Sequence, residues 1–299
     1  MADLHTSIVE KDISPGVPVR LSNLVTRITA PNSGPMTGPG TNTYLIGQQD
    51  ITVVDPGPKI DSHIQAILEA GAGRIKTIAV THTHPDHSPA ALPIAQATGA
   101  TLVGAVLEDD GHQDSTFKPG KQLQHGDAIV TQEYSLEGVF TPGHVGNHFC
   151  FCLPEEKMMF VGDHIMQGAT VVIIPPSGDM LDYIASLQLI KQYDVELIAP
   201  AHGHLMNEAY QVVDDLVAHR LRREDKVVES LQLSPNSNLD TLMAFAYADV
   251  DKRLYKIAKL SLWAHLLKLE KEFRATKHAE DHWLFGDELW TYKDSASTS

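Results

Sequence analysis

The stretch VTHTHPDHSPA (Val80–Ala90) places three histidines and one aspartate directly after an apolar run. His82 and His84 are two residues apart, so in an extended backbone their side chains point to the same face. Asp86 and His87 follow a proline, where the chain turns. Imidazole nitrogens and carboxylate oxygens are common ligands of divalent transition metals. The stretch therefore predicts a loop that supplies ligands to two adjacent metal ions, with a polar surface loop as the alternative.

Three later apolar segments also end in residues of the metal-ligand type. His144 lies in TPGH, Asp163 in VGDH and His202 in PAHG. Polar groups at strand ends can converge on one edge of a sheet stack, where ligands commonly bind. Seven such residues at four strand ends favour a metal site over a surface loop.

The first two-thirds of the chain alternate short β-like runs with helical stretches. TYLIG (Thr43–Gly47) and ITVVD (Ile51–Asp55) flank a short polar turn and predict a hairpin. Ser88 is a candidate N-cap for a helix that follows the histidine-rich loop. This alternation is typical of an α/β (α+β) layer architecture with helices outside the sheets. Helices are expected at about residues 60–70, 89–98 and 180–192.

The composition changes in the last third, where three long segments carry apolar residues at helical spacing. A further segment, residues 281–294, predicts a hairpin, and together they indicate a small winged-helix-like domain. The helical segments are residues 207–232, 239–250 and 254–276. We therefore expect a catalytic domain at 1–206, a helical winged-helix-like domain at 207–290 and a flexible tail at 291–299.

Charge and cysteine content narrow the function classes. The 299 residues include 38 acidic and 23 basic side chains, and the net charge of −15 disfavours tight, non-specific nucleic-acid binding. Cys150 and Cys152 are two apart in a predicted strand, which is a poor geometry for a disulfide and fits a reducing compartment. The sequence has neither a signal-peptide pattern nor an apolar run of about 18 residues. We expect no membrane span and a cytoplasmic location.

Basic residues concentrate in HRLRR (His219–Arg223) and in the segment that contains Lys252, Arg253, Lys256 and Lys259. Acidic residues are interleaved with them, so we interpret the group as a solvated helix surface, with an anion-binding face as the alternative. The apolar positions that follow at helical spacing predict either core packing or a homodimer face.

The motifs HTHPDH, TPGH, GD and PAHG, in this order, resemble the metallo-β-lactamase superfamily of metallohydrolases over about residues 22–206. The resemblance implies an αββα sandwich with a dinuclear metal site at one edge. GPGTNTYLIG (Gly38–Gly47), the segment GATVV…DYIASL (Gly168–Leu187) and the helical C-terminal domain resemble the β-lactamase-like protein 2 family. The chain departs from many superfamily members at Ser88-Pro89-Ala90, where glycines are common. This departure affects the start of the following helix and leaves the ligand residues intact.

The same resemblance implies a role for each ligand-type residue. The first metal would be held by His82, His84 and His144. The second would be held by Asp86, His87 and His202, and Asp163 would bridge the two. Zn²⁺ is the default ion for such ligands, with Mn²⁺ or Fe as alternatives.

The ligand set predicts a hydrolase in which two divalent ions lower the pKa of a shared water from about 16 to near 7. The metal-bound hydroxide would attack a small ester, thioester or lactone, with Asp86 as the catalytic residue that orients the nucleophile. A metal-dependent endoribonuclease or phosphodiesterase is the main alternative, because ribonuclease activity is attributed to members of the family that the chain resembles. A β-lactam hydrolase ranks lower, because true metallo-β-lactamases lack the bridging aspartate. A non-catalytic metal-binding effector and a redox di-iron enzyme are weaker alternatives.

Overall fold

The computed structural model describes residues 13–108, 111–278 and 288–293. The hairpin predicted from TYLIG and ITVVD is present inside a six-stranded sheet. The six strands are neighbours in chain order; the first four are antiparallel, and the last two join in parallel. They are β1 (Val19–Arg20), β2 (Val25–Thr29), β3 (Asn42–Ile46), β4 (Ile51–Val54), β5 (Ile75–Ala79) and β6 (Thr101–Val103).

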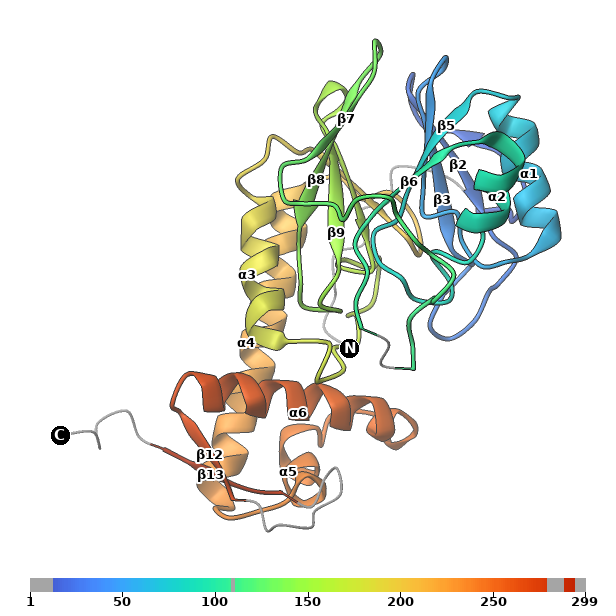
Figure 1. Ribbon diagram of the computed structural model, residues 1–299. Helices are drawn as coiled ribbons and strands as arrows, with labels where there is room; N and C mark the ends of the chain where they lie inside the picture. The colour runs from blue at the N-terminus through green and yellow to red at the C-terminus, as the bar shows by residue number, and fades with distance from the viewer. Residues whose placement is uncertain (1–12, 109–110, 279–287, 294–299) are drawn as a thin grey trace.

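A second sheet of five strands faces the first (Figure 1). Its strands also lie in chain order, and all pairs are antiparallel except the last, which follows a helical crossover and is parallel. The strands are β7 (Ala128–Val130), β8 (Ser135–Phe140), β9 (Phe149–Leu153), β10 (Met158–Gly162) and β11 (Leu197–Pro200), with a 3₁₀ turn, η1 (Pro154–Glu156), between β9 and β10.

Helices cover the outer face of each sheet. Two of them bury Ile67 and Ile94 against the first sheet, and two others pack on the second sheet around Tyr183 and Val213. The resulting αββα order confirms the fold predicted from the sequence. The helices are α1 (Asp61–Gly71) and α2 (Ala91–Thr98) on the first sheet, and α3 (Met180–Ile190) and the first half of α4 (Ala209–Leu233) on the second.

Strand β9 shows why the sandwich forms from this sequence. All five of its residues are buried, as expected for a strand covered on both faces. Phe149, Phe151 and Leu153 point into the core between the sheets. Cys150 and Cys152 point to the other face, into the core under α3 and α4. Because alternate side chains of a strand point to opposite faces, this one apolar strand contributes to two cores.

The two cysteines are free thiols, as the sequence analysis predicted. Burial raises the pKa of Cys150 and of Cys152 to about 12. A thiol with such a pKa carries almost no thiolate at neutral pH, so both side chains act as core residues.

The last third of the described chain forms a separate group of helices with its own core, which includes Leu242, Leu262 and Trp290. A two-stranded sheet packs beside the helices, below the sandwich in Figure 1. The elements are the second half of α4, α5 (Leu239–Ala246), the 3₁₀ turn η2 (Lys252–Leu254), α6 (Tyr255–Lys271), β12 (Ala275–His278) and β13 (Leu289–Tyr292).

The hairpin of this region differs from the sequence prediction. The helix expected to continue to Thr276 ends at Lys271, and β12 begins four residues later. Its partner β13 lies within the predicted hairpin segment, so the pairing links Lys277 with Trp290. Burial of Trp290 against the helices favours this pairing over an extra helical turn. Residues 279–287, which join the strands, lie outside the described part of the chain.

Two further details correct the sequence analysis. Ser88 does not cap α2, because the helix begins at Ala91 and the Ser88 hydroxyl donates to Asp114 Oδ2 at 2.7 Å. Thr291 and Tyr292 belong to β13, so the tail prediction is wrong for them; residues 294–299 are not described. The division of the chain at 206 and 207 stays a prediction, since α4 contributes to both cores.

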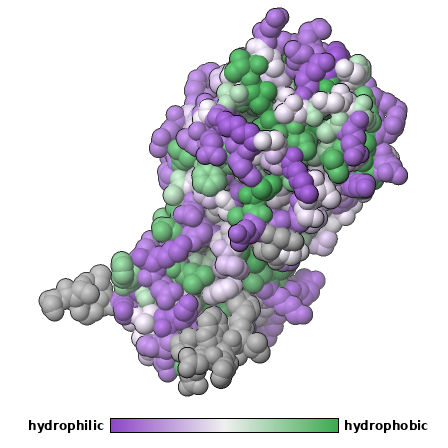
Figure 2. Space-filling model, in the orientation of Figure 1, coloured by the Kyte–Doolittle hydropathy of each residue, from purple (hydrophilic) through white to green (hydrophobic). Residues whose placement is uncertain are grey.

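The visible surface is largely hydrophilic, with hydrophobic residues in scattered patches (Figure 2). Large exposed apolar side chains include Phe245 and Leu254, each 50% exposed. Among the described residues, no helix combines the length and the apolar character that a membrane span requires.

A buried ion-pair group ties α4 to α6 in the second core. The carboxylate of Glu224 is 4% exposed and lies 2.8 Å from Lys268 Nζ and 2.8 Å from Arg274 Nη1. Burial favours its neutral form, but His265 and Lys268 outweigh burial and lower the pKa of Glu224 to about 2. The charged carboxylate therefore stabilises the folded state at neutral pH.

We expect Glu224→Gln to lower the free energy of unfolding by roughly 3 kcal/mol at pH 7, because the buried Lys268 loses one of its two carboxylate partners and Arg274 loses an ion pair. The folded pKa lies below the unfolded one, so this contribution is complete above about pH 4.5 and decreases as the pH falls towards 2. Urea unfolding of both proteins at pH 7 and pH 3 measures the difference. The exposed substitution Glu229→Gln is the control, and equal losses for the two variants would contradict the prediction.

Candidate metal centre

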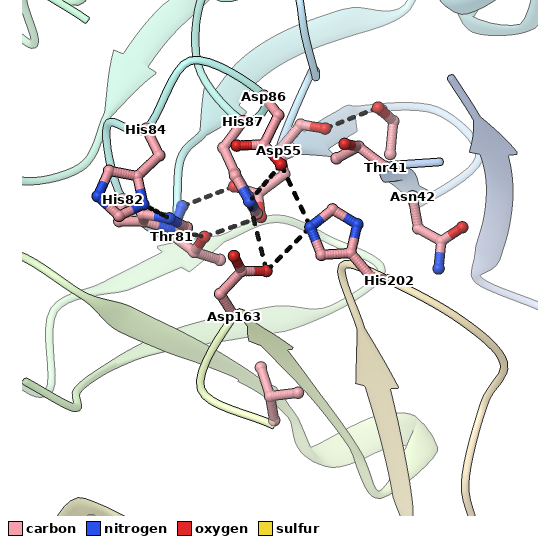
Figure 3. A network of polar contacts seen from close by, with 12 residues as sticks. Thr41, Asn42, Asp55, Thr81, His82, His84, Asp86, His87, Asp163 and His202 are labelled. Atoms are coloured by element: carbon pink, nitrogen blue, oxygen red, sulfur yellow. Dashed lines mark hydrogen bonds and ion pairs between the residues drawn. The ribbon is translucent and has the colours of Figure 1, made fainter. Parts of the chain in front are cut away.

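The seven ligand-type residues follow four strands that end at the same edge of the sandwich. The loop after β5 carries four of them, and the loops after β8, β10 and β11 carry His144, Asp163 and His202. Figure 3 shows side chains from the loops after β5, β10 and β11 pointing towards one another. The structure thus brings together all seven, in two groups whose potential ligand atoms lie within 4.8 Å of one another: His82, His84 and His144; and Asp86, His87, Asp163 and His202.

The first group consists of three imidazoles. His84 Nδ1 lies 2.9 Å from His82 Nε2 and 3.1 Å from His144 Nε2. Burial, followed by the neighbouring imidazole of His144, lowers the pKa of His84 to about 4. Burial also lowers the pKa of His82 and of His144. Three neutral nitrogens that face one point are the arrangement by which imidazoles bind a metal ion.

The second group mixes imidazoles with carboxylates. His202 Nε2 lies 3.2 Å from Asp86 Oδ2 and 3.2 Å from Asp163 Oδ1. His87 Nε2 lies 3.5 Å and 3.4 Å from the same two oxygens. Burial opposes protonation of His202, but Asp163 and Asp86 outweigh it and raise the pKa of the imidazole to about 9. The carboxylates thus concentrate negative charge at a point that a cation can occupy.

Asp163, a member of the second group, also faces the first. Its Oδ1 faces His87 and His202, and its Oδ2 lies 3.7 Å from His144 Nε2. One carboxylate therefore directs one oxygen towards each group, which is the geometry that a bridging ligand requires.

Three atoms of the second group test whether these residues fit a metal. His87 Nε2, Asp163 Oδ1 and His202 Nε2 are buried and have no hydrogen-bond partner within the described chain. Buried polar atoms without partners are costly and rare in folded proteins. Their convergence on one point fits a bound divalent cation, which would satisfy all three.

Hydrogen bonds to the outer ring nitrogens hold the ligand imidazoles in place. His144 donates from Nδ1 to the carbonyl of Val172 at 2.8 Å, and His202 donates from Nδ1 to the carbonyl of Gly40 at 3.3 Å. These bonds leave Nε2 of each ring directed at the centre. Such outer partners set the tautomer and orientation of metal-binding histidines.

Asp55 is a residue of the site that sequence reasoning missed, because it was interpreted only as the last residue of the predicted hairpin strand ITVVD. Its carboxylate accepts from the Thr81 amide at 2.7 Å, from the Thr81 hydroxyl at 2.8 Å and from His87 Nδ1 at 3.0 Å. The Thr81 hydroxyl in turn accepts from His82 Nδ1 at 3.0 Å. Asp55 thereby orients one imidazole of each group. An acidic residue at the end of a buried strand was the available signal.

Asn42, at the start of β3, holds the loop that carries His202. Its amide donates to the carbonyl of Pro200 at 3.0 Å and to that of Gly203 at 2.8 Å. Tyr44 is a core residue, and its hydroxyl also donates to the carbonyl of Pro200, at 2.7 Å. The first sheet therefore positions a ligand that belongs to the second sheet.

His148 and His164 lie beside the centre and belong to neither ligand group. His148 Nδ1 is 3.0 Å from the Thr141 hydroxyl, and the rings of His148 and His82 are 5.1 Å apart. The ring of His164 packs at 4.8 Å against Tyr183. Both are buried neighbours that pack around the ligand loops.

Comparison with known proteins agrees with this geometry. Residues 36–202 match the family described as Metallo-beta-lactamase superfamily, and residues 239–283 match the Beta-lactamase associated winged helix domain. The chain belongs to the metallo-β-lactamase superfamily. It is a hydrolase of the metallo-β-lactamase fold with a C-terminal winged-helix domain, and its His and Asp groups fit a dinuclear divalent metal site.

Relatives within the superfamily agree with the resemblance seen in the sequence. The chain is 32% identical to the Beta-lactamase-like protein 2 homolog of Caenorhabditis elegans, over 71% of this chain and 72% of that protein. It is 29% identical to Thioesterase pkgB of Emericella nidulans, over 77% of this chain and 65% of that protein. The resemblance to the β-lactamase-like protein 2 family is confirmed.

Solved structures confirm the fold. A Beta-lactamase domain protein from Burkholderia ambifaria superposes with a TM-score of 0.77 at 18% identity, covering 95% of this chain and 96% of that chain. The agreement extends over nearly the whole length, so it includes both the sandwich and the helical domain.

We expect Asp55→Ala to lower the affinity for a divalent metal, with Zn²⁺ as the probe, by roughly ten- to a hundredfold, because His87 and Thr81 lose their hydrogen-bond acceptor. Zinc titration against a chromophoric chelator measures the affinity. Asp61→Ala, at an exposed position of α1, is the matched control and should bind zinc like the unmodified protein. Wild-type affinity in the Asp55 variant would show that the ligand loops hold their geometry without it.

Proposed function

We propose that the chain is a dinuclear zinc hydrolase that acts on small thioesters. The Asp163 carboxylate, directed at both ligand groups, is the observation that carries the proposal. The ligand assignment follows the two groups in the structure. One ion would be held by His82, His84 and His144, the other by Asp86, His87 and His202, and Asp163 would serve both.

The site lacks an obvious proton donor for a leaving group, and this favours a thioester over an amide or a β-lactam as the substrate. The seven side chains provide imidazoles and carboxylates, but no ammonium, guanidinium or phenol group that would donate a proton to a poor leaving group. A thiol has a pKa of about 8.5 and leaves as a thiolate near neutral pH. Thioesters are also the substrate class that the name of a fungal relative states for that protein. Esters and lactones are the neighbouring substrate classes.

The chain's own residues would orient water and substrate. When bound, a pair of zinc ions supplies Lewis acidity and lowers the pKa of a water molecule. Asp86 directs Oδ2 at His87 and His202, and its side chain is 28% exposed, which leaves Oδ1 to accept a hydrogen bond from a water. We assign to Asp86 the orientation of the attacking water and the acceptance of its proton.

Phosphodiester hydrolysis is a second candidate, favoured by one observation. A cavity of about 560 Å³ in the second domain is lined by Lys252, Lys256 and Lys259, which could contact phosphates. Lys259 is already paired with Asp240 at 2.9 Å, and the net charge of −15 opposes the approach of nucleic acid. The thioester proposal therefore ranks first.

Two further expectations stay predictions. The buried, free thiols of Cys150 and Cys152 agree with a cytoplasmic location. The second expectation is a homodimer, and light scattering of the purified protein would measure it.

The experiment that tests the proposed function is a substrate panel on zinc-reconstituted protein. It compares an acyl thioester, its oxygen ester, a lactone, nitrocefin, bis-p-nitrophenyl phosphate and single-stranded RNA at equal enzyme concentration. We expect the highest kcat/KM for the thioester and loss of turnover with a chelator. Turnover of RNA alone would reverse the ranking, and turnover that survives removal of metal would refute the mechanism.

We expect Asp163→Ala to retain one zinc per chain instead of two and to lose most activity, because one carboxylate serves both ligand groups. Metal content after dialysis, measured by elemental analysis, reports the loss directly. Asp225→Ala, at an exposed position of α4, should keep both ions. Two ions per chain in the Asp163 variant would disprove the bridging role.

A further inference from the structure

We propose that Arg220 is a positioning residue through which helix α4 orients His144 and Asp163. The proposal rests on the proposed metal centre. It concerns a residue that the sequence analysis placed on a solvated basic surface.

Arg220 is buried in the helix that joins the two cores. Only 3% of the residue is exposed, whereas Arg222 on the same helix is exposed. Its core neighbours on α4, Leu216 and Val217, are apolar. A buried guanidinium is costly, and helix packing alone would be served by another apolar side chain. We therefore infer that the polar contacts of the Arg220 guanidinium, and not its packing alone, account for its buried position.

The first contact of Arg220 leads to His144. Arg220 Nη2 donates to the carbonyl of Val171 at 2.6 Å, and the next carbonyl, of Val172, accepts from His144 Nδ1 at 2.8 Å. Residues 170–174 belong to no helix or strand, so side-chain contacts must hold this backbone in place. By fixing one carbonyl, Arg220 sets the neighbouring carbonyl that aligns the imidazole of His144.

The second contact leads to Asp163. The guanidinium carbon of Arg220 lies 5.1 Å from the ring centroid of Tyr183, within the range of a cation–π contact. The Tyr183 hydroxyl donates to the carbonyl of His164 at 3.0 Å, and His164 follows Asp163 in the chain. The Tyr183 ring also packs on the ring of His164. Arg220 thus supports two backbone segments, one beside the carbonyl that aligns His144 and one directly after Asp163.

Helix α4 connects this support to the second domain. Its first half belongs to the core under the second sheet, and its second half contributes Val227 and Leu231 to the core of the helical domain. Arg220 lies between these two parts. The segment Gly168–Leu187 contains both Val171 and Tyr183. Through these two residues it links α4 to His144 and Asp163.

The test compares Arg220→Met and Arg220→Lys with two matched controls. Arg222→Met makes the same substitution at an exposed position of α4. Val227→Ala removes buried methyl groups from the same helix in the second core, which lowers stability without touching residues 168–174. Each full-length protein is measured by zinc titration against a chelator, by thermal unfolding and, free of metal, by hydrogen exchange of residues 168–174.

We expect Arg220→Met to weaken zinc binding roughly ten- to a hundredfold, with the larger loss at the equivalent held by His144 and a smaller loss at the other, because Asp163 serves both. Amides of residues 168–174 should exchange faster in the metal-free variant. Arg220→Lys should recover part of both effects, because it retains a buried donor. Val227→Ala should lower the unfolding temperature and keep both zinc affinities, and Arg222→Met should match the unmodified protein.

Unchanged zinc affinity in Arg220→Met overturns the proposal, even if hydrogen exchange increases, because Arg220 would then be a structural residue only. Equal loss of affinity in Val227→Ala also overturns it, because general destabilisation would be the cause. If the unmodified protein binds fewer than two zinc ions, the proposed function fails instead. Hydrogen exchange in the metal-free chain then decides whether Arg220 holds the segment.

Discussion

The centre of this protein depends on the Asp163 carboxylate, which presents one oxygen to His144 and the other to His87 and His202. A carboxylate can serve two groups only if both lie close to its oxygens, and here the imidazole nitrogens lie 3.2 to 3.7 Å from them. The site is shielded from water, because Asp163 is 9% exposed and His87 and His202 are nearly inaccessible to solvent. Charges that would be screened in water therefore interact strongly here.

The layered fold places that carboxylate where both sheets can reach it. Strands β4, β9 and β10 are buried on both faces, so the ligand-type side chains are placed where strands end. Four such ends lie at one edge of the sandwich, two sheets contribute to it, and hydrogen bonds cross between them. Asn42 of the first sheet holds the His202 loop of the second. A shift of one sheet against the other would therefore separate the ligands.

A second set of contacts surrounds the ligands and extends away from them. Asp55 links an imidazole of each group through Thr81, and Arg220 reaches the carbonyl next to the one that aligns His144. Metal sites depend on such outer partners for affinity as well as for orientation. Arg220 belongs to a helix that contributes to both cores, so the support that we propose for the ligands extends to the winged-helix domain.

The sequence by itself indicated the ligand-type residues and the strands of the layered architecture, because residue type and apolar periodicity are local properties. The His and Asp residues follow apolar runs, and a period of two in TYLIG or HFCFCL is readable without any partner. Tertiary structure decided whatever depends on distant residues. Arg220 is buried where it contacts the carbonyl of Val171 and the ring of Tyr183. Residues 275–278 form a strand because they pair with the strand that contains Trp290. Ser88 donates to Asp114 instead of capping a helix. Asp55 is a ligand-orienting residue only because His87 lies beside it, 32 positions further along the chain.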